Sequence, residues 1–152
     1  RQQGETSRAL ADLQQALRYS PHATDVLLAI AAIDYEMDRP QRCLTSIHHL
    51  LDVYAPGEEP QQALWLEGLA YQALDRPHEA AESLYAASLR GPPHAELLYR
   101  LALAEQAAGR TDSAIDTVQQ ALALDAAHPG SLHLQSSLRT ARADHADGTL
   151  LR

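Results

Sequence analysis

The sequence predicts an all-α protein, a right-handed α-solenoid built from antiparallel helix pairs. The segments 61–94 and 95–128 align with each other over 34 residues without a gap. Within each segment, small and large apolar residues recur at helical spacing. A repeat in this range of lengths is typical of stacked helical units and not of a closed globule. We therefore expect five to seven antiparallel helices and no strand.

The two aligned segments share their small and large positions. Small residues at Gly68 and Ala80 let the two helices of a hairpin, over 61–73 and 78–91, approach closely, and Leu84 fills the space beside them. We expect Gly68 to be a packing residue. A shift of 34 pairs Gly68 with Ala102, Ala80 with Ala114, Leu84 with Val118, Ala87 with Ala121 and Arg76 with Arg110.

The same pattern extends towards the front of the chain. A shift of 37 places the segment 24–60 on 61–94, with the three extra residues in the loop 55–60, where an insertion costs little. A shift of 71 then aligns a helix over about 5–19 with the second helix of 61–94. The segment 1–23 is therefore expected to be half a repeat.

At the back of the chain, Leu132 and Ser136 lie 34 residues beyond Leu98 and Ala102. This spacing predicts one extra helix over about 129–142. The segment 143–152 matches no part of the repeat, so we expect it to be a tail that is mobile or docked on the last helix.

The turns within the repeats have recognisable residues. Pro77 disfavours helical geometry in the residue before it, so it separates the helices of its hairpin. Gly109 is suited to the same place in the next repeat, because it tolerates a left-handed cap.

These residues resemble the tetratricopeptide repeat (TPR) family over about 5–142. The resemblance implies a TPR-like superhelix whose inner face is lined by the first helix of each repeat. The sequence departs from the family pattern at Glu67, at Ala126, and at Asp34 and Glu105, which replace the aromatic of Tyr71. The best-matched repeat carries Leu64, Gly68, Tyr71, Ala80, Leu84, Ala87 and Pro92 at the family's positions.

Composition excludes several classes of function. Hydrophobic residues form 45% of the chain and aromatics only 5%, which predicts a soluble domain with a tightly packed helical core. A net charge of −8 argues against nucleic acid, whose phosphates require a basic face. No apolar run approaches the roughly 20 residues that cross a bilayer. The chain has no Lys, Phe or Asn, which points to a GC-rich, bacterial genome, and the compartment stays open between cytoplasm and periplasm.

Searches for catalytic motifs find none, so we expect no enzyme activity, no cofactor and no metal. The single Cys43 occupies a small core position of the repeat. His22, His94 and His128 recur at the turn that leads into the next repeat, and the simplest interpretation is that this turn favours a polar residue. Asp34 and Glu105 are expected at the margin of the core, bonded to Arg or water.

The resemblance places the candidate binding surface on the concave face. Trp65 and Tyr99 stand 34 residues apart, each one residue past a core leucine, where a ligand could contact them. Alternatively, Trp65 packs between neighbouring first helices as a spacer. The predicted partner-binding groove consists of Leu28, Tyr35, Trp65, Leu69, Gln72, Tyr99, Leu103 and Gln106.

The predicted partner is a protein or peptide with apolar side chains. Co-chaperone TPR domains hold a peptide carboxylate with Lys, Arg and Asn, and here Lys and Asn are absent. The function that follows is a non-catalytic interaction module. The alternative is a TPR region of a larger enzyme, such as a glycosyltransferase or sulfotransferase. We also expect a homodimer through the front half repeat, because its helix exposes Leu10, Leu13 and Leu17.

Overall fold

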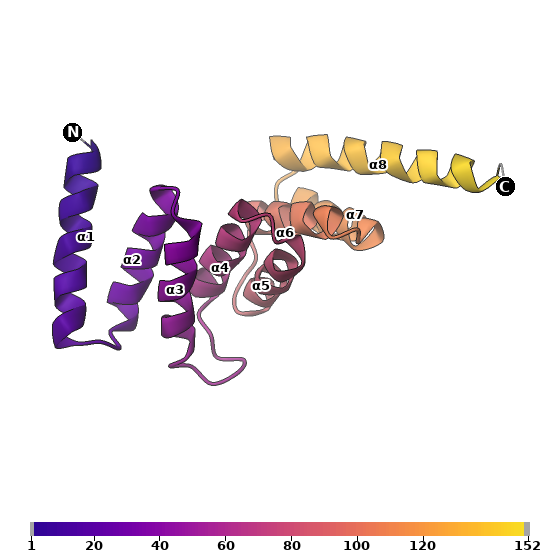
Figure 1. Cartoon of the computed structure of the whole chain (residues 1–152). Coiled ribbons are helices and arrows are strands. Elements are labelled where there is room, and N and C mark those ends of the chain that lie inside the picture. The colour runs from indigo at the N-terminus through magenta and orange to yellow at the C-terminus, as the bar shows by residue number, and fades with distance from the viewer. Residues whose placement is uncertain (1, 151–152) are drawn as a thin grey trace.

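The structure is a computed structural model that describes residues 2–150, with side-chain surroundings for residues 2–148. This part of the chain forms eight α-helices and contains no β-strand. Successive helices run in opposite directions along a curved array, with α1 and α8 at its two ends (Figure 1). The helices are α1 (Gln2–Tyr19), α2 (Thr24–Glu36), α3 (Pro40–Leu51), α4 (Gln61–Ala73), α5 (Pro77–Leu89), α6 (Ala95–Ala107), α7 (Thr111–Leu124) and α8 (Pro129–Leu150).

The predicted fold class is confirmed: the molecule is a right-handed α-solenoid of antiparallel helix pairs. Three hairpins, α2–α3, α4–α5 and α6–α7, follow one another, and each packs on the next. The described residues form eight helices, one more than the expected upper limit of seven, and the three pairs and two end helices of the repeat alignment account for all eight.

The hairpins depend on close contact between small and large side chains. Leu84 and Ala80 of α5 have no exposed surface, and both lie against α4 at Gly68. A Cβ built on Gly68 would overlap Leu84 Cγ and would lie 2.6 Å from Leu84 Cδ2. The equivalent Ala102 of α6 is also fully buried. Gly68 is therefore a packing residue, as the repeat pattern predicts.

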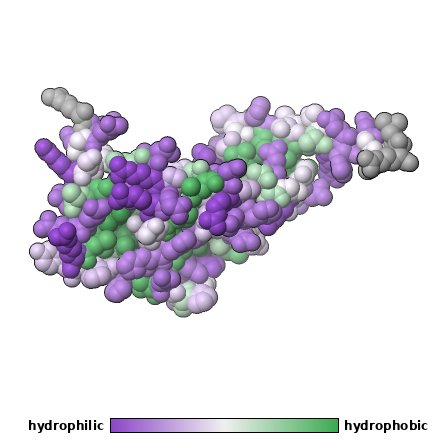
Figure 2. All heavy atoms as spheres, viewed as in Figure 1, coloured by the Kyte–Doolittle hydropathy of each residue, from purple (hydrophilic) through white to green (hydrophobic). Residues whose placement is uncertain are grey.

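The core continues from one repeat to the next without a break. Buried residues form four clusters, and Trp65 packs against three of them, so it joins neighbouring repeats. Hydrophobic residues gather along the middle of the array, whereas the outer part of α8 is largely hydrophilic (Figure 2). Within the described residues, no helix combines the length and apolar character needed to span a membrane.

The turn inside each hairpin uses one left-handed residue. Asp38, Asp75 and Gly109 have φ of 57°, 55° and 78°. The residue that follows each of them donates its backbone N–H to a carbonyl five positions earlier, for example Arg110 to Glu105 at 2.8 Å. This geometry closes the C-terminus of a helix. The role predicted for Gly109 is confirmed, and Asp shares it because Asp tolerates the left-handed region.

The ends of the array differ from two expectations. The helix predicted over 129–142 continues to Leu150, so the boundary expected after residue 142 is wrong; residues 151–152 of the expected tail lie outside the described part. In α1, the expectation that Leu10 is exposed is also wrong. Leu10 is only 7% exposed, because α1 packs on α2, and Leu13 and Leu17 are half-buried.

The hairpin contact predicts the effect of adding one methyl group. Gly68→Ala should destabilise the protein by roughly 1–3 kcal/mol, because Leu84 is fully buried and must move. Gly4→Ala is the matched control in α1, where a Cβ meets nothing within 4 Å. It should raise stability by about 0.5–1 kcal/mol. Urea unfolding measures both changes, and equal effects of the two variants would contradict the contact.

Candidate functional site

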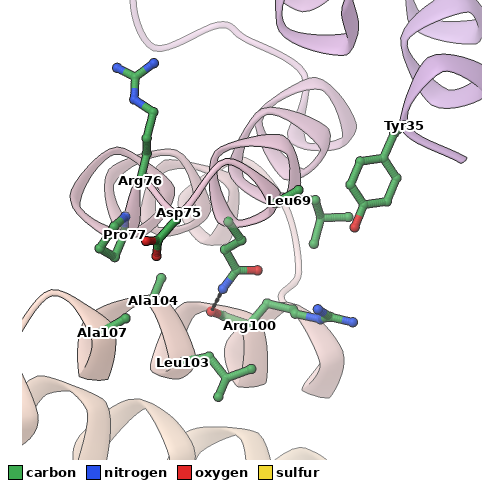
Figure 3. Close-up of a pocket in the computed structure, with 11 residues that line it drawn as sticks. Tyr35, Leu69, Asp75, Arg76, Pro77, Arg100, Leu103, Ala104 and Ala107 are labelled. Carbon is green, nitrogen blue, oxygen red and sulfur yellow. Dashed lines mark hydrogen bonds between the residues drawn. The ribbon is translucent and has the colours of Figure 1, made fainter. Parts of the chain in front are cut away.

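A hollow of about 370 Å³ lies on the face formed by the first helices of the repeats. Its apolar walls come from three helices: Tyr35 of α2, Leu69 of α4, and Leu103 of α6 (Figure 3). The polar lining comes chiefly from Gln72, Arg100 and the α4–α5 turn. The full lining is Tyr35, Leu69, Gln72, Ala73, Asp75, Arg76, Pro77, Arg100, Leu103, Ala104 and Ala107.

The eight predicted groove residues fall into two groups. The structure brings Tyr35, Leu69, Gln72 and Leu103 together around the hollow. The other four, Leu28, Trp65, Tyr99 and Gln106, are half-buried and do not line it. The predicted groove did not include Ala73, Ala104 and Ala107, which also line the hollow. Their side chains are small, and this leaves the hollow open.

Trp65 and Tyr99 occupy equivalent seams between repeats. The Trp65 ring meets the His94 ring edge-on, with centroids 5.4 Å apart, and the Tyr99 and His128 centroids are 5.2 Å apart. Tyr99 also lies against the first turn of α8, where a Cβ on Gly130 would come within 2.7 Å of Tyr99 Cζ. Each aromatic therefore packs under the histidine that starts the next repeat.

Two of the recurring histidines, His94 and His128, do more than provide a polar side chain at the turn. His94 Nδ1 accepts a hydrogen bond from the backbone N–H of Leu97, and His128 Nδ1 accepts one from Ser131, both at 3.1 Å. These bonds satisfy backbone donors at the first turns of α6 and α8. His22 differs, because its ring packs edge-on against His49, with centroids 5.4 Å apart.

The bonds of His128 fix its tautomer. Because Nδ1 accepts from Ser131, the proton of the neutral ring lies on Nε2, which is 3.0 Å from Glu96 Oε2 and donates to it. Glu96 also accepts from Arg100 Nε at 2.8 Å. Burial raises the pKa of Glu96, but the hydrogen bonds from Arg100 and His128 outweigh it and hold that pKa below its ordinary value.

The polar groups around the hollow are largely engaged with the protein itself. Gln72 Nε2 donates to the backbone oxygen of Arg100 at 2.8 Å, which ties α4 to α6 (Figure 3). Arg76 pairs with Glu79 at 2.7 Å and stacks over the Tyr71 ring, 4.8 Å from its centroid. The Arg76 side chain is directed away from the apolar residues of the hollow (Figure 3). The hollow thus offers apolar walls with paired charges at its edge.

Comparison with protein families identifies the repeat. The tetratricopeptide repeat model matches residues 95–128, the segment that holds α6 and α7. The match covers one repeat of the array, residues 95–128. The rest of the array has the TPR fold as well. No curated protein sequence matches the chain at a significant level.

Solved TPR structures match nearly the whole array. A crystal structure of MamA superimposes with a TM-score of 0.86 at 17% identity, covering 94% of this chain and 82% of that one. YrrB, described as a TPR protein with an unusual peptide-binding site, gives 0.83 at 16% identity, covering 92% and 71%. The second TPR domain of human RPAP3, solved in complex with the HSP70 peptide SGPTIEEVD, gives 0.70 at 14% identity, covering 79% and 98%.

Two TPR positions that usually hold an aromatic carry buried carboxylates. Asp34 is 1% exposed, and its Oδ1 lies 3.6 Å from Arg42 Nε and 3.9 Å from an Arg39 nitrogen. Glu105 is 8% exposed. Burial raises its pKa, although a hydrogen bond from Thr117 and the charge of Arg110 act in the opposite direction. Both carboxylates are deeper than the margin of the core where the sequence placed them.

A third carboxylate joins two hairpins. Glu67 accepts a hydrogen bond from the Ser83 hydroxyl at 2.7 Å, and its other oxygen lies 3.1 Å from His48 Nε2. Tyr71 OH also lies 3.2 Å from that nitrogen. Because Ser83 donates to the carboxylate and does not contact the histidine, this group has no activated nucleophile. Its contacts link α3, α4 and α5.

The remaining reactive side chain is Cys43. It has no exposed surface, and burial, together with the charge of Asp34, raises its pKa to about 12. The thiol is therefore protonated near neutral pH and packs as a small apolar group. Among the described residues, no three His, Cys, Asp or Glu side chains are placed to hold a metal ion.

The raised pKa of Glu105 predicts a pH-dependent stability difference. The ionised form is disfavoured by folding, so stability from this group is lost as pH rises through the folded-state pKa. Glu105→Gln keeps an acceptor for Thr117 and should raise the melting temperature at pH 7. The gain should shrink as pH falls from the raised folded-state pKa towards 4.5, the ordinary carboxyl value, and should level off below it, where the carboxyl is protonated in both states. Thermal melts across pH measure it, with the exposed Glu82→Gln as control; a constant difference would contradict the burial effect.

Proposed function

We propose that this chain is a non-catalytic protein-interaction module that binds apolar side chains of a peptide or partner protein in its concave hollow. The observation that carries the proposal is the hollow itself. Tyr35, Leu69 and Leu103 reach it from three successive repeats. Its volume of about 370 Å³ falls within the roughly 300–1,000 Å³ of ligand pockets and accommodates apolar side chains.

Structural relatives support a role in binding. YrrB is described as having a peptide-binding site, and the RPAP3 domain is solved with a bound peptide. At identities of 16% and 14%, these structures show a shared fold but not a shared ligand. The type of peptide must therefore be inferred from the residues of this chain.

The charges around the hollow favour apolar recognition over capture of a carboxylate. The two arginines of the lining are already paired, Arg100 with Glu96 at 2.8 Å and Arg76 with Glu79 at 2.7 Å. Binding an anionic terminus would require breaking one of these pairs. Binding an apolar side chain would leave both in place and would remove Tyr35 and Leu103 from water, which is favourable.

The same hollow would serve if the array were the TPR region of a larger enzyme such as a glycosyltransferase or sulfotransferase. In that case it would recruit a substrate protein while another domain performed the reaction. The full-length reading frame distinguishes these contexts, because it shows whether a catalytic domain is joined to the array.

The binding surface can be tested by selecting displayed random peptides on the purified chain. We expect enrichment of sequences with two or more large apolar residues, and weaker binding of the selected peptides to Leu103→Glu. Removal of an aromatic anchor by Tyr35→Ala should cost roughly 2 kcal/mol of affinity. Leu124→Glu is the matched control, since Leu124 is 56% exposed on α7, outside the lining of the hollow.

Circular dichroism and melting curves should show that all three variants keep the helical fold. Equal loss of peptide binding in Leu103→Glu and Leu124→Glu would place the binding surface elsewhere. Selection of peptides without apolar residues would contradict the proposed recognition chemistry.

A further inference from the structure

The hollow lies at the C-terminal ends of three successive first helices. Tyr35 is in the last turn of α2, and Ala73 and Ala107 are the last residues of α4 and α6. The C-terminus of a helix carries a partial negative charge that favours cations nearby. None of these three helices has a basic residue in its last turn to offset that charge. The backbone therefore makes this wall of the hollow electronegative.

One side-chain charge of the lining has no ion-pair partner among the described residues. It is the carboxylate of Asp75, an exposed residue of the α4–α5 turn. Both positive charges of the lining, on Arg76 and Arg100, are paired with glutamates. The Asp75 carboxylate is directed towards the α6 side of the hollow, whereas the Arg76 guanidinium is directed away from it (Figure 3). The unpaired charge of the hollow is thus negative.

The fold does not account for the carboxylate of Asp75. Asp75 is the left-handed residue of its turn, with φ of 55°, and Gly109 holds the same position in the next hairpin with φ of 78°. Because glycine serves there without a side chain, the turn does not need a carboxylate. The Asp75 carboxylate also makes no hydrogen bond to a described residue, so it is available to a ligand.

Gln72, in the same lining, adds an unused acceptor. Its Nε2 donates to the backbone oxygen of Arg100 at 2.8 Å, which turns the amide nitrogen towards α6 (Figure 3). Its Oε1 is buried and accepts no hydrogen bond from a described residue. A wall with unused acceptors disfavours a ligand that brings further acceptors, such as a carboxylate, and favours one that brings donors.

We propose that the hollow binds a peptide segment in which a Lys or Arg side chain lies beside apolar side chains. The apolar side chains pack against Leu69 and Leu103, and the basic side chain passes Ala104 so that its charged end meets Asp75. This inference rests on the proposed binding of apolar side chains in the hollow and adds the charge of the partner. The preference is opposite to that of co-chaperone TPR domains, which hold a peptide carboxylate.

A specific contact must be distinguished from general attraction, because the whole chain has a net charge of −8 and attracts basic peptides to many places. Asp38 provides the comparison within the chain. It is the left-handed residue of the α2–α3 turn, with φ of 57°, and it is exposed like Asp75. Asp38 does not line the hollow, so its charge contributes only to the general attraction.

The probes are peptides selected on the purified chain from a displayed random library and then synthesised with acetylated and amidated ends. We expect the selected sequences to contain a Lys or Arg near their apolar residues. Replacing this basic residue by Gln should weaken binding by about fivefold, the upper end for an exposed ion pair. Replacing it by Glu should weaken binding further, because the peptide then brings a like charge to Asp75. Isothermal titration calorimetry measures these affinities.

Asp75→Asn removes the charge and keeps the turn, because Asn also tolerates the left-handed region. This variant should bind the basic peptide about fivefold more weakly and should bind the Gln version as the original chain does. The two substitutions form a double-mutant cycle that isolates the contact between the charges. Asp38→Asn is the matched control and should bind both peptides as the original chain does. Circular dichroism and melting temperature should stay unchanged in both variants.

The outcomes separate this inference from the proposed function. Selected peptides that bind more weakly to Tyr35→Ala, but carry no basic residue or bind Asp75→Asn undiminished, would refute the charge preference and leave apolar recognition in place. Equal weakening in Asp75→Asn and Asp38→Asn would show that only the overall charge attracts the peptide, and the proposal would be wrong. Failure to select any peptide whose binding depends on Tyr35 would overturn both.

Discussion

The contact between a small residue on a first helix and a large residue on its partner determines the geometry of this molecule. At Gly68 the backbone of α4 approaches Leu84 so closely that even a methyl group would overlap it. Ala102 and Ala31 hold the same position in the neighbouring hairpins and are fully buried. Because each hairpin closes in the same way, each repeat presents its first helix on the same side, and the concave face follows from this.

The seams between repeats then decide which parts of that face are filled. Trp65 and Tyr99 pack beneath His94 and His128, which also satisfy backbone donors at the start of the next first helix. These seams occupy the N-terminal halves of the first helices. Towards their C-terminal halves the lining includes small residues such as Ala73 and a Gln72 amide bonded to α6, and this leaves a hollow.

Much of this arrangement could be predicted from the sequence, because a 34-residue register determines which residues meet inside a hairpin. The packing role of Gly68 follows from that register alone. The sequence could not predict which of the groove residues line the hollow. Alignment places Trp65 and Leu69 on one face, but it does not show that His94 covers Trp65. Contacts between repeats depend on their relative rotation, which sequence spacing does not contain. The length of α8 was missed because repeat matching places a turn near residue 143, where Ala143 stands at the position of the left-handed Gly109 and the helix continues.

The central claim is that contacts within each hairpin stabilise the fold, and that contacts between neighbouring repeats couple the stability of one hairpin to that of the next. Native-state hydrogen exchange resolved by residue tests this most directly. The account predicts the slowest exchange in α4, α5 and α6, where hairpin and seam contacts surround each helix, and the fastest exchange in α1 and in α8 beyond Arg139. Uniform protection from α1 to α8, or stronger protection in the end helices than in α4 and α5, would contradict it.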